Sequence, residues 1–347
     1  MAEATALAGA QVAVWRRLLT GDLSAPGPPI GAPEWAERLA DLVGAPLVAE
    51  AAPDALDGDA VEHGQLAGRL LQDRQMKTVA MLVETNLEFL CMKGFANAHQ
   101  FYSPAWVRTT GDLDVLVRNS DLQAAVGHLK QAGFRAVTLD LPPWGFLSEA
   151  SYLPLVSPDG IVSVDLHVLP DCYPLYRGLS TEQVMARRRW LEVDGTRVPV
   201  AAPEHALLIA VANATKEKLG PSAIKSLLDC GRILTQVDTL DWSEVHDVAA
   251  RAMLAVPLSA TLRLVQRLGV DLPAVAENDL SALGSSAGSE LERARCDFLE
   301  VFEQPFDWRA KLRRELLLTS EFTVALRRMR SRFVGLFSPR SGLPPGV

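Results

Sequence analysis

Cysteine is scarce and scattered in this chain. Only four occur among 347 residues, and no two of them have the C-x-x-C spacing: Cys91, Cys172, Cys230 and Cys296. Zinc sites and disulfide frameworks need more closely or regularly spaced cysteines, so the sequence predicts neither. Isolated thiols of this kind are typical of proteins in a reducing compartment.

Long apolar runs and an excess of basic residues are also missing. No stretch of eighteen apolar residues is present, so no membrane-spanning helix is expected. Glu3 stands where a signal peptide has its basic start, and Arg16 and Arg17 follow the apolar stretch. The net charge of −8 disfavours a general nucleic-acid binder, since phosphate contacts need clustered lysine and arginine. We expect a cytoplasmic protein with no membrane partner.

A polar-faced β-strand is predicted at 112–117. Side chains alternate across a strand, so Asp112 and Asp114 share one face. The opposite face carries Leu113, Val115 and Val117. A D-x-D pair alone is weak evidence, because such pairs also occur in turns, helix caps and solvated strands. Its meaning depends on what lies beside it.

A second strand with the same character is predicted at 161–168. Asp165 and His167 project from one face of it, and the other face is apolar: Val162, Val164, Leu166 and Val168. If the two strands are neighbours, three carboxylates converge. Like charges disfavour one another's ionisation, and a divalent metal relieves that repulsion. Two Mg²⁺ ions held by carboxylates are the apparatus of in-line phosphoryl or nucleotidyl transfer.

The segment upstream of the first strand adds groups suited to phosphate. The apolar run 89–92 ends in Lys93 and Gly94, and a helical turn is predicted at 95–101. Glycine allows a ligand to approach the backbone, and a helix start offers free N–H groups to phosphate. Lys93 adds a point charge suited to a triphosphate. Arg108 precedes the acidic strand.

Local signals predict the surrounding elements. A long helix is expected over 62–86, and Ser120 with Gln123 is typical of a capping box for the helix that follows. A further strand is expected over 134–139, and Asp194-Gly195 predicts a hairpin with a type I′ turn. Further helix caps are expected at Asp241, with Glu244 three residues on, and at Asp307. The Pro-rich stretch 140–160 is expected to form a long loop beside the site.

The order of these parts resembles the uncharacterised nucleotidyltransferase family of the DNA polymerase β-type superfamily. Lys93-Gly94, Arg108, the segment from Asp112 to Val117, and Val164-Asp165-Leu166-His167 match the family's motifs over roughly residues 75–235. Asn213 stands near a position where the family tends to have histidine. Lys216, Lys218 and Asp229 fall near other polar positions of the family.

The resemblance implies a role for each matched residue. Asp112, Asp114 and Asp165 would hold Mg²⁺ or Mn²⁺, and Asp165 would also help to deprotonate the acceptor hydroxyl. The phosphates of an NTP would be bound by Lys93, by the backbone at Gly94 and by Arg108, for which a structural salt bridge is the alternative. His167 would contact substrate or orient another ligand, with a structural histidine as the alternative.

The resemblance also implies the fold. We expect an α/β (α+β) nucleotidyltransferase core with a mixed sheet at 81–200, flanked by an N-terminal helical region at 1–80. A C-terminal all-helical domain is expected at 201–335, and a disordered tail at 336–347.

Three functions remain open from the sequence. The first is metal-dependent transfer of a nucleoside monophosphate from an NTP to a hydroxyl of a small molecule, peptide or protein, by two-metal in-line displacement. The second is transfer from another phosphate-bearing donor, such as a nucleotide sugar, to a peptide, because D-x-D motifs also hold metal–diphosphate groups in glycosyltransferases. The third is a non-catalytic module that binds nucleotide or peptide. A ribosomally made peptide is one acceptor that the family resemblance suggests.

Overall fold

The computed structural model describes residues 2–24, 27, 33–136, 151, 154–273, 285–317 and 323–327. Its centre is a seven-stranded mixed sheet with the order β3-β4-β5-β2-β1-β7-β6. The strands are β1 (Phe89–Met92), β2 (Leu113–Val117), β3 (Arg135–Ala136), β4 (Leu155–Val156), β5 (Ser163–His167), β6 (Arg189–Val193) and β7 (Thr196–Val200). The expected α/β fold with a mixed sheet is confirmed.

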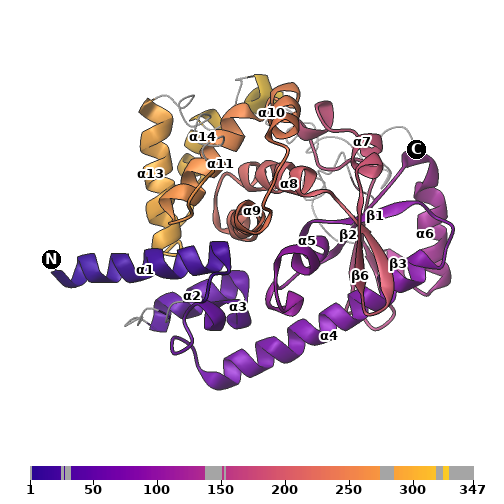
Figure 1. The fold of residues 1–347 in the computed structure, drawn as a ribbon, viewed down its shortest axis with the longest axis horizontal. Coiled ribbons are helices and arrows are strands. Elements are labelled where there is room, and N and C mark those ends of the chain that lie inside the picture. Colours follow the sequence, from indigo (N-terminus) through magenta and orange to yellow (C-terminus); the bar gives the residue numbers. More distant parts are fainter. Residues whose placement is uncertain are drawn as a thin grey trace.

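Helices precede, interrupt and follow this sheet (Figure 1). Before it come α1 (Ala2–Thr20), α2 (Pro33–Val43), α3 (Ala45–Ala51) and α4 (Gly58–Val83). Among the strands lie α5 (Lys93–Phe101), the short turns η1 (Ala105–Val107), η2 (Asn119–Asp121) and η4 (Leu175–Arg177), and the helices α6 (Leu122–Gln131) and α7 (Thr181–Ala186). After it come α8 (Pro203–Lys216), η5 (Pro221–Ala223), α9 (Ile224–Gln236), α10 (Trp242–Arg251), α11 (Ala255–Arg267), α13 (Ser285–Leu299) and α14 (Trp308–Leu317). The described residues after Val200 form helices and no strand.

The alternation of side chains along the strands separates two apolar cores. Leu113, Val115 and Val117 of β2 pack with the apolar residues of α4 and α6. Leu116 of the same strand belongs to the larger core, which includes α8, α9 and α11. In Figure 1, α6 lies on one side of the sheet and α5, α8 and α9 lie on the other. Asp114 lies on the Leu116 face, so it is directed toward the C-terminal helices.

Strand register brings the acidic residues together. β2 pairs with β5 in parallel, with Asp114 opposite Asp165 and Leu116 opposite His167. β1 pairs with β2 in the antiparallel sense, with Met92 opposite Asp114. The carboxyl end of β1 therefore meets the amino end of β2, and the Lys-Gly segment follows at that point. The expectation that the two polar-faced strands are neighbours is confirmed.

Several local predictions are confirmed. The long helix expected over 62–86 is α4, and β6 and β7 form the predicted hairpin. Asp194 and Gly195 have φ values of 48° and 76°, as a type I′ turn requires. Asp241 accepts a hydrogen bond from the Glu244 backbone N–H and so caps α10. Asp307 likewise accepts from the backbone N–H of the residue three positions on, at 2.8 Å.

One local prediction is wrong. Ser120 does not cap a helix, because η2 intervenes and the Ser120 hydroxyl donates to the Asp121 carboxylate instead. The helical turn expected over 95–101 is confirmed as part of α5, which begins two residues earlier, at Lys93, where φ is 52°.

Two further predictions fall largely outside the described residues. Most of the expected loop at 140–160 and all of the expected tail at 336–347 lie there, as does the end of the strand expected over 134–139. Within the described part of the chain, no helix is both long enough and apolar enough to cross a membrane.

Close packing of α9 against α1 depends on Gly231. A Cβ at this position would lie 2.8 Å from Leu19, including its backbone oxygen, so Gly231→Ala should push the two helices apart and lower the melting temperature. Gly127→Ala in α6 is the matched control, because a Cβ there meets nothing within 4 Å. It should gain about 0.5–1 kcal/mol from the higher helix propensity of alanine. Equal melting temperatures for the two variants would contradict this packing account.

Candidate active site

Two carboxylates and an imidazole meet where β2 and β5 lie side by side. Asp114, Asp165 and His167 each offer a ligand atom, and these atoms lie within 4.8 Å of one another. Asp114 is 5% exposed and His167 is likewise buried, whereas Asp165 is only partly buried. Asp112 directly precedes β2, and its carboxylate interacts electrostatically with Asp114 and Asp165. The close group thus consists of Asp114, Asp165 and His167. That Asp112 joins them as a third metal-holding carboxylate stays a prediction.

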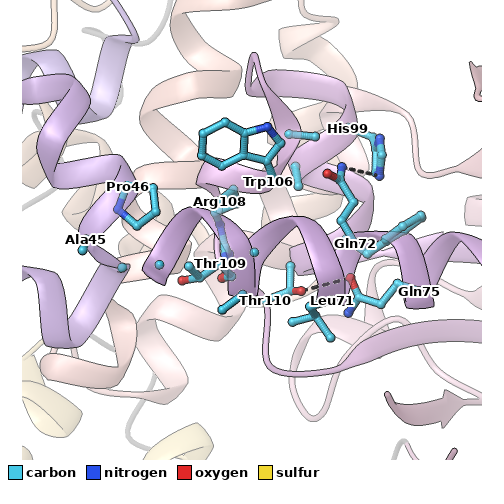
Figure 2. A pocket seen from close by; sticks show the side chains of 17 residues that line it. Ala45, Pro46, Leu71, Gln72, Gln75, His99, Trp106, Arg108, Thr109 and Thr110 are labelled. Atoms are coloured by element: carbon cyan, nitrogen blue, oxygen red, sulfur yellow. Dashed lines mark hydrogen bonds between the residues drawn. The ribbon is translucent and has the colours of Figure 1, made fainter. Parts of the chain in front are cut away.

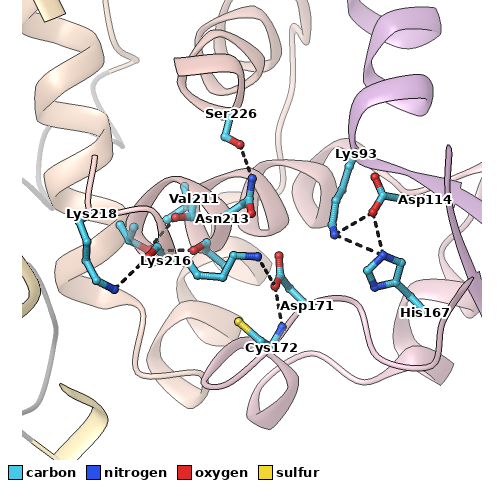
Figure 3. Close-up of polar contacts among 12 residues, drawn as sticks. Lys93, Asp114, His167, Asp171, Cys172, Val211, Asn213, Lys216, Lys218 and Ser226 are labelled. Carbon is cyan, nitrogen blue, oxygen red and sulfur yellow. Dashed lines mark hydrogen bonds and ion pairs between the residues drawn. The ribbon is translucent and has the colours of Figure 1, made fainter. Parts of the chain in front are cut away.

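Lys93 balances part of this negative charge. Lys93 is the first residue of α5, and its ammonium donates a hydrogen bond of 2.9 Å to Asp114 Oδ1 (Figure 3). Burial alone would lower the pKa of Lys93, but the nearby carboxylates of Asp114 and Asp171 raise it well above its ordinary value. Burial in turn would raise the pKa of Asp114, yet Lys93 and His167 hold it well below the usual range. This pair is charged at neutral pH.

His167 shares the same carboxylate oxygen. Its Nε2 lies 2.7 Å from Asp114 Oδ1 and 3.5 Å from Lys93 Nζ. Burial and the Lys93 ammonium lower the pKa of His167, so the ring is neutral. With Nε2–H donating to Asp114, the buried Nδ1 keeps its lone pair, and it has no hydrogen-bond partner among the described residues.

The two remaining carboxylates cannot both ionise freely. The Asp114 charge, followed by burial, raises the pKa of Asp112 to about 6. Burial, followed by the charges of Asp112 and Asp114, raises the pKa of Asp165 to about 7. One carboxylate is thus fixed as an anion while its two neighbours titrate near neutrality. A divalent cation beside these carboxylates would relieve their mutual repulsion and favour their charged forms.

Gly94 lies where α5 approaches the loop that leads to β2. A Cβ on Gly94 would stand 3.1 Å from the Thr110 methyl group, so a larger residue would press on that loop. The first N–H groups of α5 have no acceptor within their own helix, and α5 begins directly after Met92, which is opposite Asp114.

Arg108 is already engaged by a carboxylate. Its Nε and Nη2 donate to the two oxygens of Asp229 on α9, at 2.9 and 2.8 Å. Asn97 and Tyr102 donate to the same carboxylate, at 2.9 and 2.8 Å. Arg108 and Asp229 are both buried. The salt bridge that was the alternative for Arg108 is therefore present, and it joins the loop before β2 to α9.

A second ion pair lies beside the acidic cluster and was not predicted. Asp171, four residues after the end of β5, pairs with Lys216 of α8 at 3.4 Å (Figure 3). Burial would raise the pKa of Asp171, but Lys216 and Lys93 outweigh it and hold the pKa at about 2. The available signal was a carboxylate just past the end of an acidic strand, a position that sequence spacing alone does not distinguish from a turn residue.

The other polar positions of the C-terminal helices have structural partners. Asn213 Nδ2 donates to Ser226 Oγ at 2.7 Å, which ties α8 to α9. Lys218 pairs with Glu315 of α14. Of the three polar residues noted near family positions, Lys216 and Asp229 thus lie next to the acidic cluster or its loop, and Lys218 faces away toward α14.

A cavity of about 250 Å³ lies behind the loop that carries Arg108 (Figure 2). Its walls come from the start of α3, from α4, α5 and η1, and from residues 108–110. Gln75 stands in its wall, where its Nε2 donates to the Asp112 carbonyl and its Oε1 accepts from the Thr110 hydroxyl. The cavity wall and the amino end of the acidic strand are therefore one hydrogen-bonded unit.

The donor set suits a divalent cation. Carboxylate oxygens are the ligands that Mg²⁺ and Mn²⁺ prefer, and imidazole nitrogen adds an option for Mn²⁺. The unpartnered Nδ1 of His167 and the raised pKa values of Asp112 and Asp165 both indicate groups whose interactions are incomplete in the ligand-free protein. The side chains of this acidic cluster therefore fit a divalent metal ion.

The fold and this site define an α/β protein whose mixed sheet carries an Asp-Asp-His group compatible with metal binding. The chain belongs to the family described as uncharacterised nucleotidyltransferases, whose family model matches residues 37–269. The match runs from α2 to just beyond α11, farther than the motifs themselves extend. The protein is therefore a nucleotidyltransferase, and no curated protein matches the chain.

Loss of the Asp229 carboxylate should destabilise the fold. Asp229→Asn would leave the Arg108 guanidinium buried without a counter-charge, which costs about 3–5 kcal/mol. Glu88→Gln is the matched control, since the Glu88 pairs with Arg118 and Arg188 are about a third exposed and are worth about 1 kcal/mol or less. Urea unfolding would measure both variants. A smaller loss for Asp229→Asn than for Glu88→Gln would refute the structural role.

Stability without metal should fall as pH rises from about 4 to about 7. The pKa of Asp165 is raised from 3.8 to about 7, so the folded state holds a proton that the unfolded state releases, and this contribution is lost as pH rises through the folded value. Asp165→Asn should flatten the profile and melt higher than wild type above that range. Thermal melts across pH test this, and added Mg²⁺ should stabilise wild type more than the variant.

Proposed function

We propose that this enzyme transfers a nucleoside monophosphate from an NTP to a hydroxyl group of an acceptor, with Mg²⁺ or Mn²⁺. The acceptor oxygen forms a bond to the α-phosphorus, the bond between the α-phosphorus and the β-phosphate oxygen breaks, and pyrophosphate leaves. The bound metal supplies charge neutralisation for the phosphates and the reacting oxygens. The protein then contributes positioning and electrostatic complementarity, with little covalent chemistry of its own.

The observation that carries this proposal is the acidic cluster opposite the Lys93-Gly94 helix start. Asp112, Asp114 and Asp165 would hold the metal on adjacent strands of the sheet. Lys93 pairs with Asp114, and α5 begins at Lys93, so anionic phosphates that approach the start of α5 would meet the Lys93 ammonium and the free amides near Gly94. A negative pocket for cations beside a positive helix start for phosphates suits a metal–triphosphate.

Asp165 is the residue we assign to the acceptor proton. Its carboxylate is partly exposed beside Asp114, so an acceptor hydroxyl can come within hydrogen-bonding reach of it, as a general base requires. The proton of the acceptor hydroxyl would pass to Asp165 as the new phosphoester bond forms. His167 would keep Asp114 oriented through its Nε2–H, which leaves Nδ1 for a ligand.

Lys93 would have two successive partners. In the ligand-free protein its ammonium balances Asp114. When the donor binds, Lys93 would turn to the β- or γ-phosphate, because Asp114 then shares its charge with the metal. Arg108 would act mainly by fixing the loop before β2, since its Nε and Nη2 donate to Asp229 and its Nη1 donates to the Thr109 carbonyl.

A nucleotide sugar is the second candidate donor, since its diphosphate would meet the same metal and helix start. The acceptor remains a hydroxyl compound of open identity, with a ribosomally made peptide as one candidate. None of the four cysteines, all within the described residues, forms a disulfide, and Cys91 and Cys230 are buried thiols. This usage suits a reducing compartment, so we propose the cytoplasm as the location.

Donor binding should depend on Asp114 and on the metal. Calorimetry with each NTP should detect binding in Mg²⁺ and its loss in EDTA. Asp114→Asn should abolish the metal-dependent part and reduce transfer on the order of 100-fold, because its carboxylate is the one held as an anion. Asp112→Asn should weaken both in the same direction.

Asp247→Asn, on the exposed face of α10, is the control and should behave as wild type. Binding of a nucleotide sugar but of no NTP would shift the assignment to the second donor class. Full transfer activity in Asp114→Asn would overturn the metal site.

A further inference from the structure

Lys225 lies near the site and is not paired with any of the residues that the structure describes. It is the second residue of α9 and only partly exposed. Its ammonium forms no hydrogen bond with the described residues, and no ion pair within 4.0 Å. The two other lysines nearest the acidic cluster differ in this respect, since Lys93 is paired with Asp114 and Lys216 with Asp171.

The groups around Lys225 leave its charge uncompensated. Asp229 lies one helical turn further along α9, on the same face, but both of its oxygens are taken by Arg108. Burial, followed by the Arg108 charge, lowers the pKa of Lys225 to about 8, and the carboxylates of Asp229 and Asp112 only partly oppose this shift. Arg108 and Lys225 are therefore two positive charges near Asp112, and the Asp229 carboxylate that they share is already bonded to Arg108.

Two neighbouring faces of helix α9 are held by hydrogen bonds. Asp229, on the same face as Lys225, is bonded to Arg108, Asn97 and Tyr102. Ser226 is bonded to Asn213 of α8, as Figure 3 shows. These contacts fix the turn of α9 that carries Lys225 beside the loop of Arg108. The Lys225 ammonium is not fully enclosed by the described residues, so it is accessible to an anionic ligand.

Charge is divided across the site. Asp114, Asp165 and Asp171 lie on the β5 side, where two lysines balance them incompletely. Arg108 and Lys225 lie on the α9 side, where positive charge is in excess. A metal–triphosphate has the same division, with its cation to be met by carboxylates and its outer phosphate oxygens by ammonium groups.

We propose that Lys225 binds the triphosphate of the donor from the α9 side, opposite the carboxylates, and so makes the site selective for a chain of three phosphates. This rests on the proposed nucleotidyl transfer and adds a residue and a selectivity to it. Lys225 contacts the terminal phosphates that leave as pyrophosphate, and Lys93 contacts them from the other side.

The test is calorimetry of inorganic triphosphate with Mg²⁺, on wild type and on Lys225→Met. The variant should bind about tenfold more weakly or worse, with a shallower salt dependence, while its affinity for inorganic phosphate changes little. Lys225→Arg should restore most of the loss because it keeps the charge. Lys130→Met, which removes an exposed lysine from α6, should match wild type.

Stability without ligand separates binding from a structural role. Removing an unpaired ammonium beside Arg108 should leave the melting temperature of Lys225→Met unchanged or raised. A fall of several degrees, or triphosphate affinity within about twofold of wild type, would overturn the role of Lys225. If the wild type binds neither an NTP nor triphosphate, the proposed function is overturned as well. If the wild type binds both, the proposed function stands, and the Lys225→Met variant alone decides the role of Lys225.

Discussion

Mutual repulsion of the carboxylates at the ends of β2 and β5 is the constraint around which the core is arranged. The parallel register places Asp114 against Asp165, and the following residues answer that repulsion. Lys93 leaves the strand through a left-handed conformation to reach Asp114, and His167 donates to the same oxygen. Asp112 and Asp165 respond by holding protons more tightly. A fold selected only for stability would bury apolar side chains here. In the proposed function, this remaining negative charge is what binds the metal ion.

Much of this site follows from local rules. Side chains alternate strictly across a strand, so the residue types around Asp112 and Asp165 are enough to separate the polar face from the apolar face. The hairpin was predictable for a similar reason, because few residue pairs other than Asp194-Gly195 adopt two positive φ values in succession. The capping box at Ser120 failed because several local structures compete for the same short polar side chains, and the 3₁₀ turn was the one that formed. Family resemblance supplied the neighbour relation of the strands, which alternation alone does not give.

The remaining parts depend on contacts between distant segments. Arg108 and Asp229 are 121 positions apart, and nothing near either residue indicates the other. Asp171 acquires meaning only when α8 brings Lys216 to it. Lys225 has no hydrogen-bond or ion-pair partner among the described residues. The sequence cannot reveal this, because it depends on which segments pack around α9. Docking of α8 and α9 on the sheet thus determines which polar side chains are catalytic candidates and which are structural.

The salt bridge between Arg108 and Asp229 has a consequence for how the chain can be divided. It joins the loop before the acidic strand to a helix that lies beyond residue 200 in the chain. Dividing the chain after the last strand would therefore separate Arg108 from Asp229, its partner in the salt bridge. Recombination that exchanged the C-terminal helices for those of an unrelated protein would strand a buried guanidinium and release the loop. The sheet and α9 are therefore one structural unit, although they lie on either side of residue 200 in the chain.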